Sequence, residues 1–130
     1  LFNALGCMVL AAIAYSTINE NAMATLDAVM VARETASWRI AITSIGTGVI
    51  VTMALHGVRN GTYFPLLYGV PVFIMCGLPH SIADAFYYCV AILHGKFAGW
   101  MIMAWVWSVI GNYIGCNLPR WCMGDKFETK

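Results

Sequence analysis

Hydrophobic residues gather along the chain in four blocks that polar stretches separate. The blocks cover residues 1–15, 38–58, 63–93 and 97–116. The polar stretches between them cover 16–37, 59–62 and 94–96, and a polar tail follows at 117–130. Blocks with so few charges predict helices that cross a lipid bilayer, for which about 20 apolar residues are needed. The pattern therefore predicts an all-α integral membrane protein.

The blocks differ in how well their length fits one membrane span. Residues 1–15 are too few and indicate the remnant of a longer helix, as expected of a chain truncated at its N-terminus. Residues 38–58 and 97–116 each have the length of one span. Residues 16–37 carry several charged side chains and predict a loop with some helix.

The block 63–93 is too long for one straight span. A continuous helix over these residues would measure about 46 Å, whereas the hydrocarbon core is about 30 Å thick. The Gly77-Leu78-Pro79 stretch lies near the middle and predicts a break. Pro79 suits the first position of the helix that follows, because the N–H that proline lacks is not needed there. We therefore expect two half-helices.

Composition favours lipid as the surrounding medium. Hydrophobic residues make up 61% of the chain and charged residues 10%, whereas soluble domains are about 25% charged. So small a soluble domain has too much surface for its volume to hide this apolar area. The net charge of +1 gives no basic field for nucleic acid. The five cysteines fit neither a disulfide framework nor a metal site, so no cofactor is predicted.

Positive charges in the polar stretches indicate the orientation in the membrane. Counted on alternate sides of the predicted spans, one side carries four and the other three. The four are Arg59, Arg120, Lys126 and Lys130, and the three are Arg33, Arg39 and Lys96. The count favours a cytoplasmic C-terminus.

Two ionisable residues, His80 and Asp84, directly follow the predicted break. Four positions apart, they share one face of a helix, and the start of that helix favours an anion nearby. Ser81 between them can bond to the backbone locally. Irregular backbone at membrane depth is tolerated only where it lines a cavity or is buried in protein, and ionisable groups there point to function. The alternative is that His80 and Asp84 satisfy each other as a structural pair.

Three further residues in the apolar blocks are candidates for a pore. Phe73 lies seven residues before His80, where it would form an apolar gate or simply pack. Asn3 and Asn112 are polar groups in apolar helices, and each is followed by a glycine three residues on. Small residues let helices approach closely, and amides hydrogen-bond across them. The two asparagines are therefore candidates either for a pore lining or for helix–helix contacts.

The stretch GVPVFIMCGLPHSIADAFYY at 69–88 resembles the fifth-helix motif of the formate/nitrite transporter family. VIGNYIGC at 109–116 resembles that family's sixth-helix Gly-Asn-x-x-Gly-Gly, and FNALGC at 2–7 its third-helix counterpart. Residues 42–55 stand where its fourth helix should be, so the resemblance covers essentially all of 1–130. It implies an aquaporin-like, six-helix protomer with broken second and fifth helices. It also implies a homopentamer in the cell (inner) membrane, crossing it several times.

The resemblance also implies a function and roles for residues. Members of the family pass small monovalent anions such as formate, nitrite or hydrosulfide. By position, His80 matches the central pore histidine, and Phe73 and Val51 match constriction residues. Arg33 falls near a basic vestibule lysine. On this reading Asp84, Ser81, Asn112 and Asn3 complete the set of pore or substrate residues.

The sequence departs from the family pattern at several positions. Pro79 stands where the family has Glu, and Asp84 where it has Asn. Thr47-Gly48 replaces a common Cys-Asn pair, and helices one and two have no counterpart in residues 1–130. These changes affect substrate and proton handling more than the fold.

A comparison of the desolvation cost with the protonation cost favours passage of the anion as its neutral acid. A bare anion in an apolar constriction faces a large desolvation cost, nominally tens of kcal/mol. Protonating a carboxylate whose pKa is about 4 costs only about 4 kcal/mol at neutral pH. Two alternatives remain at this stage: a membrane-embedded enzyme that uses His80 and Asp84 as an acid–base pair, and a structural membrane subunit.

Overall fold

The computed structural model describes residues 2–34 and 38–127, and these residues form helices and turns without a strand. The elements are α1 (Phe2–Ala14), α2 (Glu20–Glu34), α3 (Arg39–Arg59), α4 (Phe64–Met75), α5 (Ser81–Leu93), α6 (Trp100–Met123) and the 3₁₀ turn η1 (Gly124–Phe127). The predicted all-α class is confirmed. Residue 1, residues 35–37 of the predicted loop, and residues 128–130 of the predicted tail, Lys130 included, lie outside the described part.

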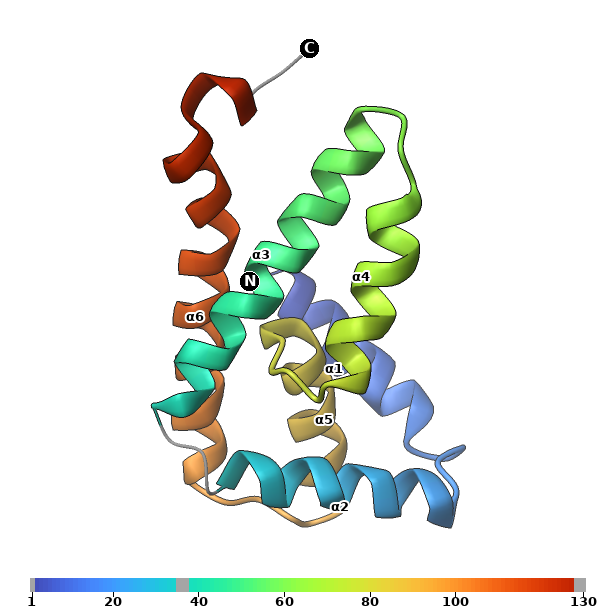
Figure 1. Cartoon of the computed structure of the whole chain (residues 1–130). Helices are drawn as coiled ribbons and strands as arrows, with labels where there is room; N and C mark the ends of the chain where they lie inside the picture. The colour runs from blue at the N-terminus through green and yellow to red at the C-terminus, as the bar shows by residue number, and fades with distance from the viewer. Residues whose placement is uncertain (1, 35–37, 128–130) are drawn as a thin grey trace.

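Two long helices and two half-length helices make up the body of the molecule (Figure 1). Helices α3 and α6 lie side by side over much of their length, and α4 runs antiparallel beside α3. Helix α4 ends about halfway along the bundle, and α5 continues from there toward the other end. Helix α1 packs on α5, while α2 lies across the bottom of the view. The two halves of block 63–93 thus meet inside the bundle.

Glycines allow α3 and α6 to approach each other closely. A side chain on Gly111 or Gly115 of α6 would collide with the backbone of α3 at Ala41 and Ile45. A side chain on Gly48 of α3 would in turn lie 2.6 Å from the Asn112 carbonyl oxygen. Such contacts are typical of small residues spaced four apart in membrane helices. This crossing fixes the relative positions of the polar residues described below.

The predicted break is present, and a helix cap at Gly77 forms it. The Leu78 N–H donates to the Phe73 carbonyl at 3.0 Å, and the Gly77 N–H donates to the Ile74 carbonyl at 3.0 Å. Gly77 has a φ of 62°. These bonds define a Schellman motif, which satisfies the last carbonyls of a helix and requires a left-handed residue. Helix α4 therefore ends in a capping motif that the glycine at position 77 makes possible.

Replacing Gly77 by alanine is expected to destabilise the chain by about 1 kcal/mol. The reason is conformational, because a left-handed backbone costs other residues about 1–2 kcal/mol, while a side chain here would meet no neighbour within 4 Å. The free energy of unfolding in detergent micelles measures the effect. Gly99→Ala is the matched control, since Gly99 has equally open surroundings but a φ of −60°. Equal losses in the two variants would contradict the role of the cap.

Most of the predicted loop at 16–37 is helical. The Asn19 side chain accepts a hydrogen bond from the Ala22 N–H at 2.9 Å, which caps the start of α2. Leu26 and Met30 are buried against the other helices, so α2 is stabilised by one apolar face. The predicted tail also differs, because α6 continues past residue 116 and ends at Met123. A helix need not end where its apolar run ends, since its backbone bonds are internal.

Candidate functional site

The candidate site is built on the start of α5, directly after the break. His80 is the N-cap of α5, with an extended backbone (φ −132°, ψ 121°). Pro79 therefore lies one residue before the cap, and the expectation that it occupies the first helical position is wrong. The first helical residue is Ser81, and its N–H donates to Asn112 of α6. Proline has no N–H and could not make this bond.

The His80 ring lies against the Phe73 ring across the break. The ring centroids are 5.7 Å apart and the planes are 20° from parallel. Phe73 is buried and His80 is half-buried. Across the break, an apolar ring near the end of α4 thus covers one face of the imidazole at the start of α5.

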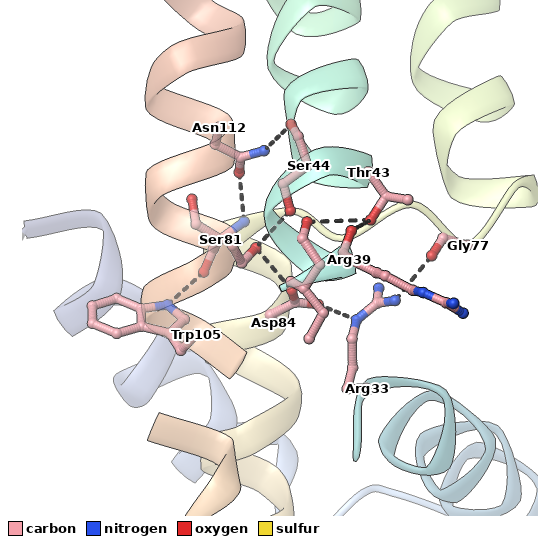
Figure 2. A network of polar contacts seen from close by, with 11 residues as sticks. Arg33, Arg39, Thr43, Ser44, Gly77, Ser81, Asp84, Trp105 and Asn112 are labelled. Atoms are coloured by element: carbon pink, nitrogen blue, oxygen red, sulfur yellow. Dashed lines mark hydrogen bonds and ion pairs between the residues drawn. The ribbon is translucent and has the colours of Figure 1, made fainter. Parts of the chain in front are cut away.

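Asp84 does not pair with His80 through its side chain. One carboxylate oxygen, Oδ1, lies 3.3 Å from Nε of Arg33, and the other, Oδ2, accepts a hydrogen bond from the Ser108 hydroxyl at 3.0 Å (Figure 2). Asp84 bonds to His80 only through the backbone, where its N–H donates to the His80 carbonyl at 2.8 Å. The structural alternative of a mutually satisfied His80–Asp84 pair does not match these contacts.

Arg33 connects α2 with both sides of the break. Its Nε faces Asp84, and its Nη1 donates to the Gly77 carbonyl at 3.1 Å (Figure 2). The side chain is 9% exposed and that of Asp84 is 1% exposed. The resemblance suggested a vestibule cation near this position, whereas the guanidinium of Arg33 is enclosed and bonded to Asp84 and Gly77. It holds together three segments, namely α2, the turn after α4, and α5.

Asn112 joins α5, α6 and α3 through its amide. Its Oδ1 accepts from the Ser81 N–H at 2.7 Å, and its Nδ2 donates to the Ser44 carbonyl at 2.8 Å. Trp105, also on α6, donates from Nε1 to the Ser81 carbonyl at 2.8 Å. The interpretation of Asn112 as a helix–helix contact fits this arrangement. Ser81 takes part through its backbone.

The other predicted site residues lie apart from this network. Val51 is half-buried on α3, and Asn3 is exposed on α1. No hydrogen bond within the described ranges joins either residue to the break. The structure therefore brings together His80 with Phe73, and Asp84, Arg33, Ser81 and Asn112 with one another, and it leaves Val51 and Asn3 outside.

Three residues of the network, Ser44, Ser108 and Trp105, were not predicted. Ser108 donates to Asp84, and the Ser44 hydroxyl lies 3.5 Å from that of Ser108. A signal was present in the spacing, because Ser108 and Asn112 are four apart and share one face of α6. Trp105 gave no comparable signal, since an aromatic residue in an apolar block needs no special reason.

The start of α5 keeps two backbone donors for a ligand. The N–H groups of Ser81 and Asp84 are taken by Asn112 and His80, while those of Ile82 and Ala83 have no partner in the part of the chain that the structure describes. Free N–H groups at a helix start carry partial positive charge and attract anions. With the adjacent imidazole, they suit a small anion that also exchanges a proton.

The described residues contain no cluster of three or more histidine, cysteine or acidic side chains that would hold a metal ion. The chemistry available at the break is therefore that of an imidazole, two backbone donors and a buried ion pair. Comparisons with protein-family models, with curated proteins and with solved structures find no match to this chain.

Proposed function

We propose that the chain forms part of a membrane pore for small monovalent anions of the formate, nitrite or hydrosulfide class. The observation that carries the proposal is the break between α4 and α5, where His80 stands at the start of a half-helix against Phe73. Half-helices that meet inside a bundle and direct a helix start toward an anion are typical of transporters. The resemblance to the formate/nitrite transporter family points the same way.

The exposed surface supports placement in a bilayer. Its accessible area is 8353 Å², whereas a compact soluble protein of 14.2 kDa exposes about 6,800 Å². Large apolar side chains are among the most exposed, including Met75 at 85% and Tyr113 at 67%. Helices α3 and α6 are long and apolar enough to span a bilayer, and only 28% and 33% of their most apolar windows is buried inside the chain. Lipid or neighbouring subunits would cover this surface.

In the proposed mechanism the anion crosses the apolar part of the pore as its neutral acid. The N–H groups of Ile82 and Ala83 attract the anion to the break, where protonated His80 gives it a proton and takes another from the solution on the entry side. Phe73 beside the imidazole excludes water, so that the charged form is held back by its desolvation cost. The neutral acid passes and releases the proton on the far side. This mechanism assigns His80 and Phe73 to the pore and Arg33 with Asp84 to its support.

The wider arrangement in the proposal follows the resemblance. It comprises an aquaporin-like bundle, a homopentamer with one pore per protomer, and several crossings of the cell (inner) membrane. Helix α1 would be the third helix of the family, α3 the fourth, α4 with α5 the broken fifth, and α6 the sixth. Val51 on α3 and Asn3 on α1 would then face parts of the pore wall beyond the contacts described above.

A structural membrane subunit is the second candidate, and a specific observation favours it. Asp84, Arg33 and Asn112 all bond to groups of the chain itself, as expected of residues that hold helices together. The enzyme alternative gains less support, because its acid–base pair needs Asp84 to bond to the imidazole and the carboxylate faces Arg33 and Ser108 instead.

Flux into liposomes tests the proposal. The native polypeptide, with whatever segments precede and follow residues 1–130 in it, is reconstituted with a pH-sensitive dye trapped inside. A formate or nitrite gradient is expected to acidify the lumen faster than in empty liposomes, because the neutral acid releases its proton there. Protein that floats with the liposomes but gives no flux would overturn the pore and favour the structural subunit. Consumption of the anion in the assay would favour an enzyme.

A further inference from the structure

A cavity with several polar lining residues lies at the opposite end of the bundle from α2 (Figure 1). It has a volume of about 410 Å³ and lies between the C-terminal parts of α3 and α6. Its lining residues are Thr52, Leu55, His56, Arg59, Cys116, Asn117, Arg120 and Phe127. Neither His80 nor any other residue of the break belongs to it, so the proposed pore does not account for it.

The cavity follows from how α3 and α6 cross. The two helices are held together at Gly48, Gly111 and Gly115, and beyond this point they diverge toward the top of Figure 1. The Thr52 hydroxyl donates to the Cys116 carbonyl at 3.3 Å and closes the space on the inner side. Phe127 of η1 stacks on His56, with ring centroids 4.4 Å apart, and forms one wall. The described residues thus bound the space on its inner side and along one wall.

The charged side chains among the described residues that line the cavity are of one sign. Arg59 comes from α3 and Arg120 from α6, and the described lining residues include no carboxylate. Arg59 is exposed, and its side chain has no partner within the described ranges. The C-terminal carbonyls of α3 do not repel an anion strongly here, because the N–H groups of Asn60, Gly61 and Thr62 are bonded to them. Two guanidinium groups flanking one space suit a phosphate group.

The surroundings of the cavity are those of a membrane interface. Leu55 is 52% exposed and Trp121, next to Arg120, is 61% exposed. Tryptophan at the end of a spanning helix is typical of the headgroup level, and exposed leucine below it suits acyl chains. The count of positive charges along the sequence favours the cytoplasmic side for this end, and basic pockets between helices on that side bind anionic headgroups.

We propose that the cavity between the ends of α3 and α6 binds the phosphate of an anionic phospholipid headgroup, with Arg59 and Arg120 as its charged ligands. The inference rests on the proposed function only in that α3 and α6 must cross a bilayer. It requires neither a pore nor transport of an anion.

Lipid binding to the purified native polypeptide in detergent micelles tests this site. Bound phosphatidylglycerol and phosphatidylcholine are compared by native mass spectrometry. Arg59→Gln is expected to weaken phosphatidylglycerol binding about fivefold, the effect of removing one cation near a headgroup, and to leave phosphatidylcholine binding unchanged. Arg39→Gln is the matched control, because Arg39 is an exposed arginine at the other end of the same helix. Arg39→Gln is expected to weaken phosphatidylglycerol binding less than twofold.

Three outcomes would overturn the inference. Equal losses in Arg59→Gln and Arg39→Gln would mean that the lipid follows overall charge. Equal binding of the two lipids by the unaltered protein would mean that no anionic headgroup is recognised. Displacement of the lipid by millimolar inorganic phosphate would mean that the site takes a free anion. Flotation with liposomes is measured in parallel, since failure to insert contradicts the membrane placement, whereas insertion without lipid selectivity contradicts this site alone.

Discussion

Replacing Arg33 by methionine is expected to destabilise the chain by about 3–5 kcal/mol. Asp84 is 1% exposed, and its carboxylate would lose the guanidinium 3.3 Å away while it stays enclosed. Removing one partner of a buried ion pair leaves a charge without compensation, and effects of this size are typical. The Gly77 carbonyl would lose its Arg33 donor as well. The free energy of unfolding in detergent micelles gives the measurement.

A second ion pair in the same chain provides the matched control. Lys96 binds Asp27 of α2, with Nζ 2.8 Å from Oδ2, but both side chains are about half exposed. Lys96→Met is therefore expected to cost no more than about 1 kcal/mol. The double variant Arg33→Met with Asp84→Asn removes both buried charges and is expected to recover most of the loss. If Arg33→Met cost no more than Lys96→Met, the buried pair would not hold α2 to the break.

The break was predictable because its cause is local. Gly77 and Pro79 lie within three residues of each other, and both oppose a continuous helix in known ways. Helix α2 was only partly predicted, although Leu26, Met30 and Arg33 recur at the spacing of one helical face and Asn19 offers a cap. The charged residues between them concealed this pattern.

The contacts of the site were not predictable, because they join residues far apart in the sequence. Arg33 and Asp84 are separated by 51 positions, and Ser81 and Asn112 by 31. Spacing within one helix suggested that Asp84 would face His80, but a carboxylate at that depth binds the strongest donor within reach. Only the packing of α2 beneath the break supplies that donor. The sequence thus indicated which residues matter around the break and not which of them meet.

Replacing His80 by asparagine is expected to lower formate flux by about 10- to 150-fold at neutral pH. The proposed pore uses the imidazole as the charged partner of the anion, and a hydrogen bond to a charged group contributes about 1.5–3 kcal/mol. Flux is measured in liposomes that contain the native polypeptide, at equal protein content. His94→Asn is the matched control, because His94 caps the other end of α5. Ser81→Ala controls for the break itself, since Ser81 bonds through its backbone.

The pH dependence distinguishes a proton donor from a merely structural histidine. Without a donor in the pore, only acid protonated in solution enters, and its concentration falls about tenfold for each pH unit above the pKa of the acid. Flux through His80→Asn is therefore expected to fall about tenfold per unit. Between about pH 5 and pH 6, where an imidazole still carries a proton, flux through the unaltered protein is expected to fall less steeply, because His80 protonates anions that arrive charged.

The variant Asp84→Asn separates support of the pore from transfer of the proton. Asp84 bonds to Arg33 and Ser108, so its loss is expected to lower the stability of the chain, while folded protein keeps the pH slope of the unaltered protein. A slope that steepens to that of His80→Asn would instead place Asp84 in the proton path. Unchanged flux with unchanged pH dependence in both variants would remove the break from the transport mechanism altogether. The two slopes therefore decide whether the ion pair beneath His80 acts on the proton or only on the position of the helix that presents it.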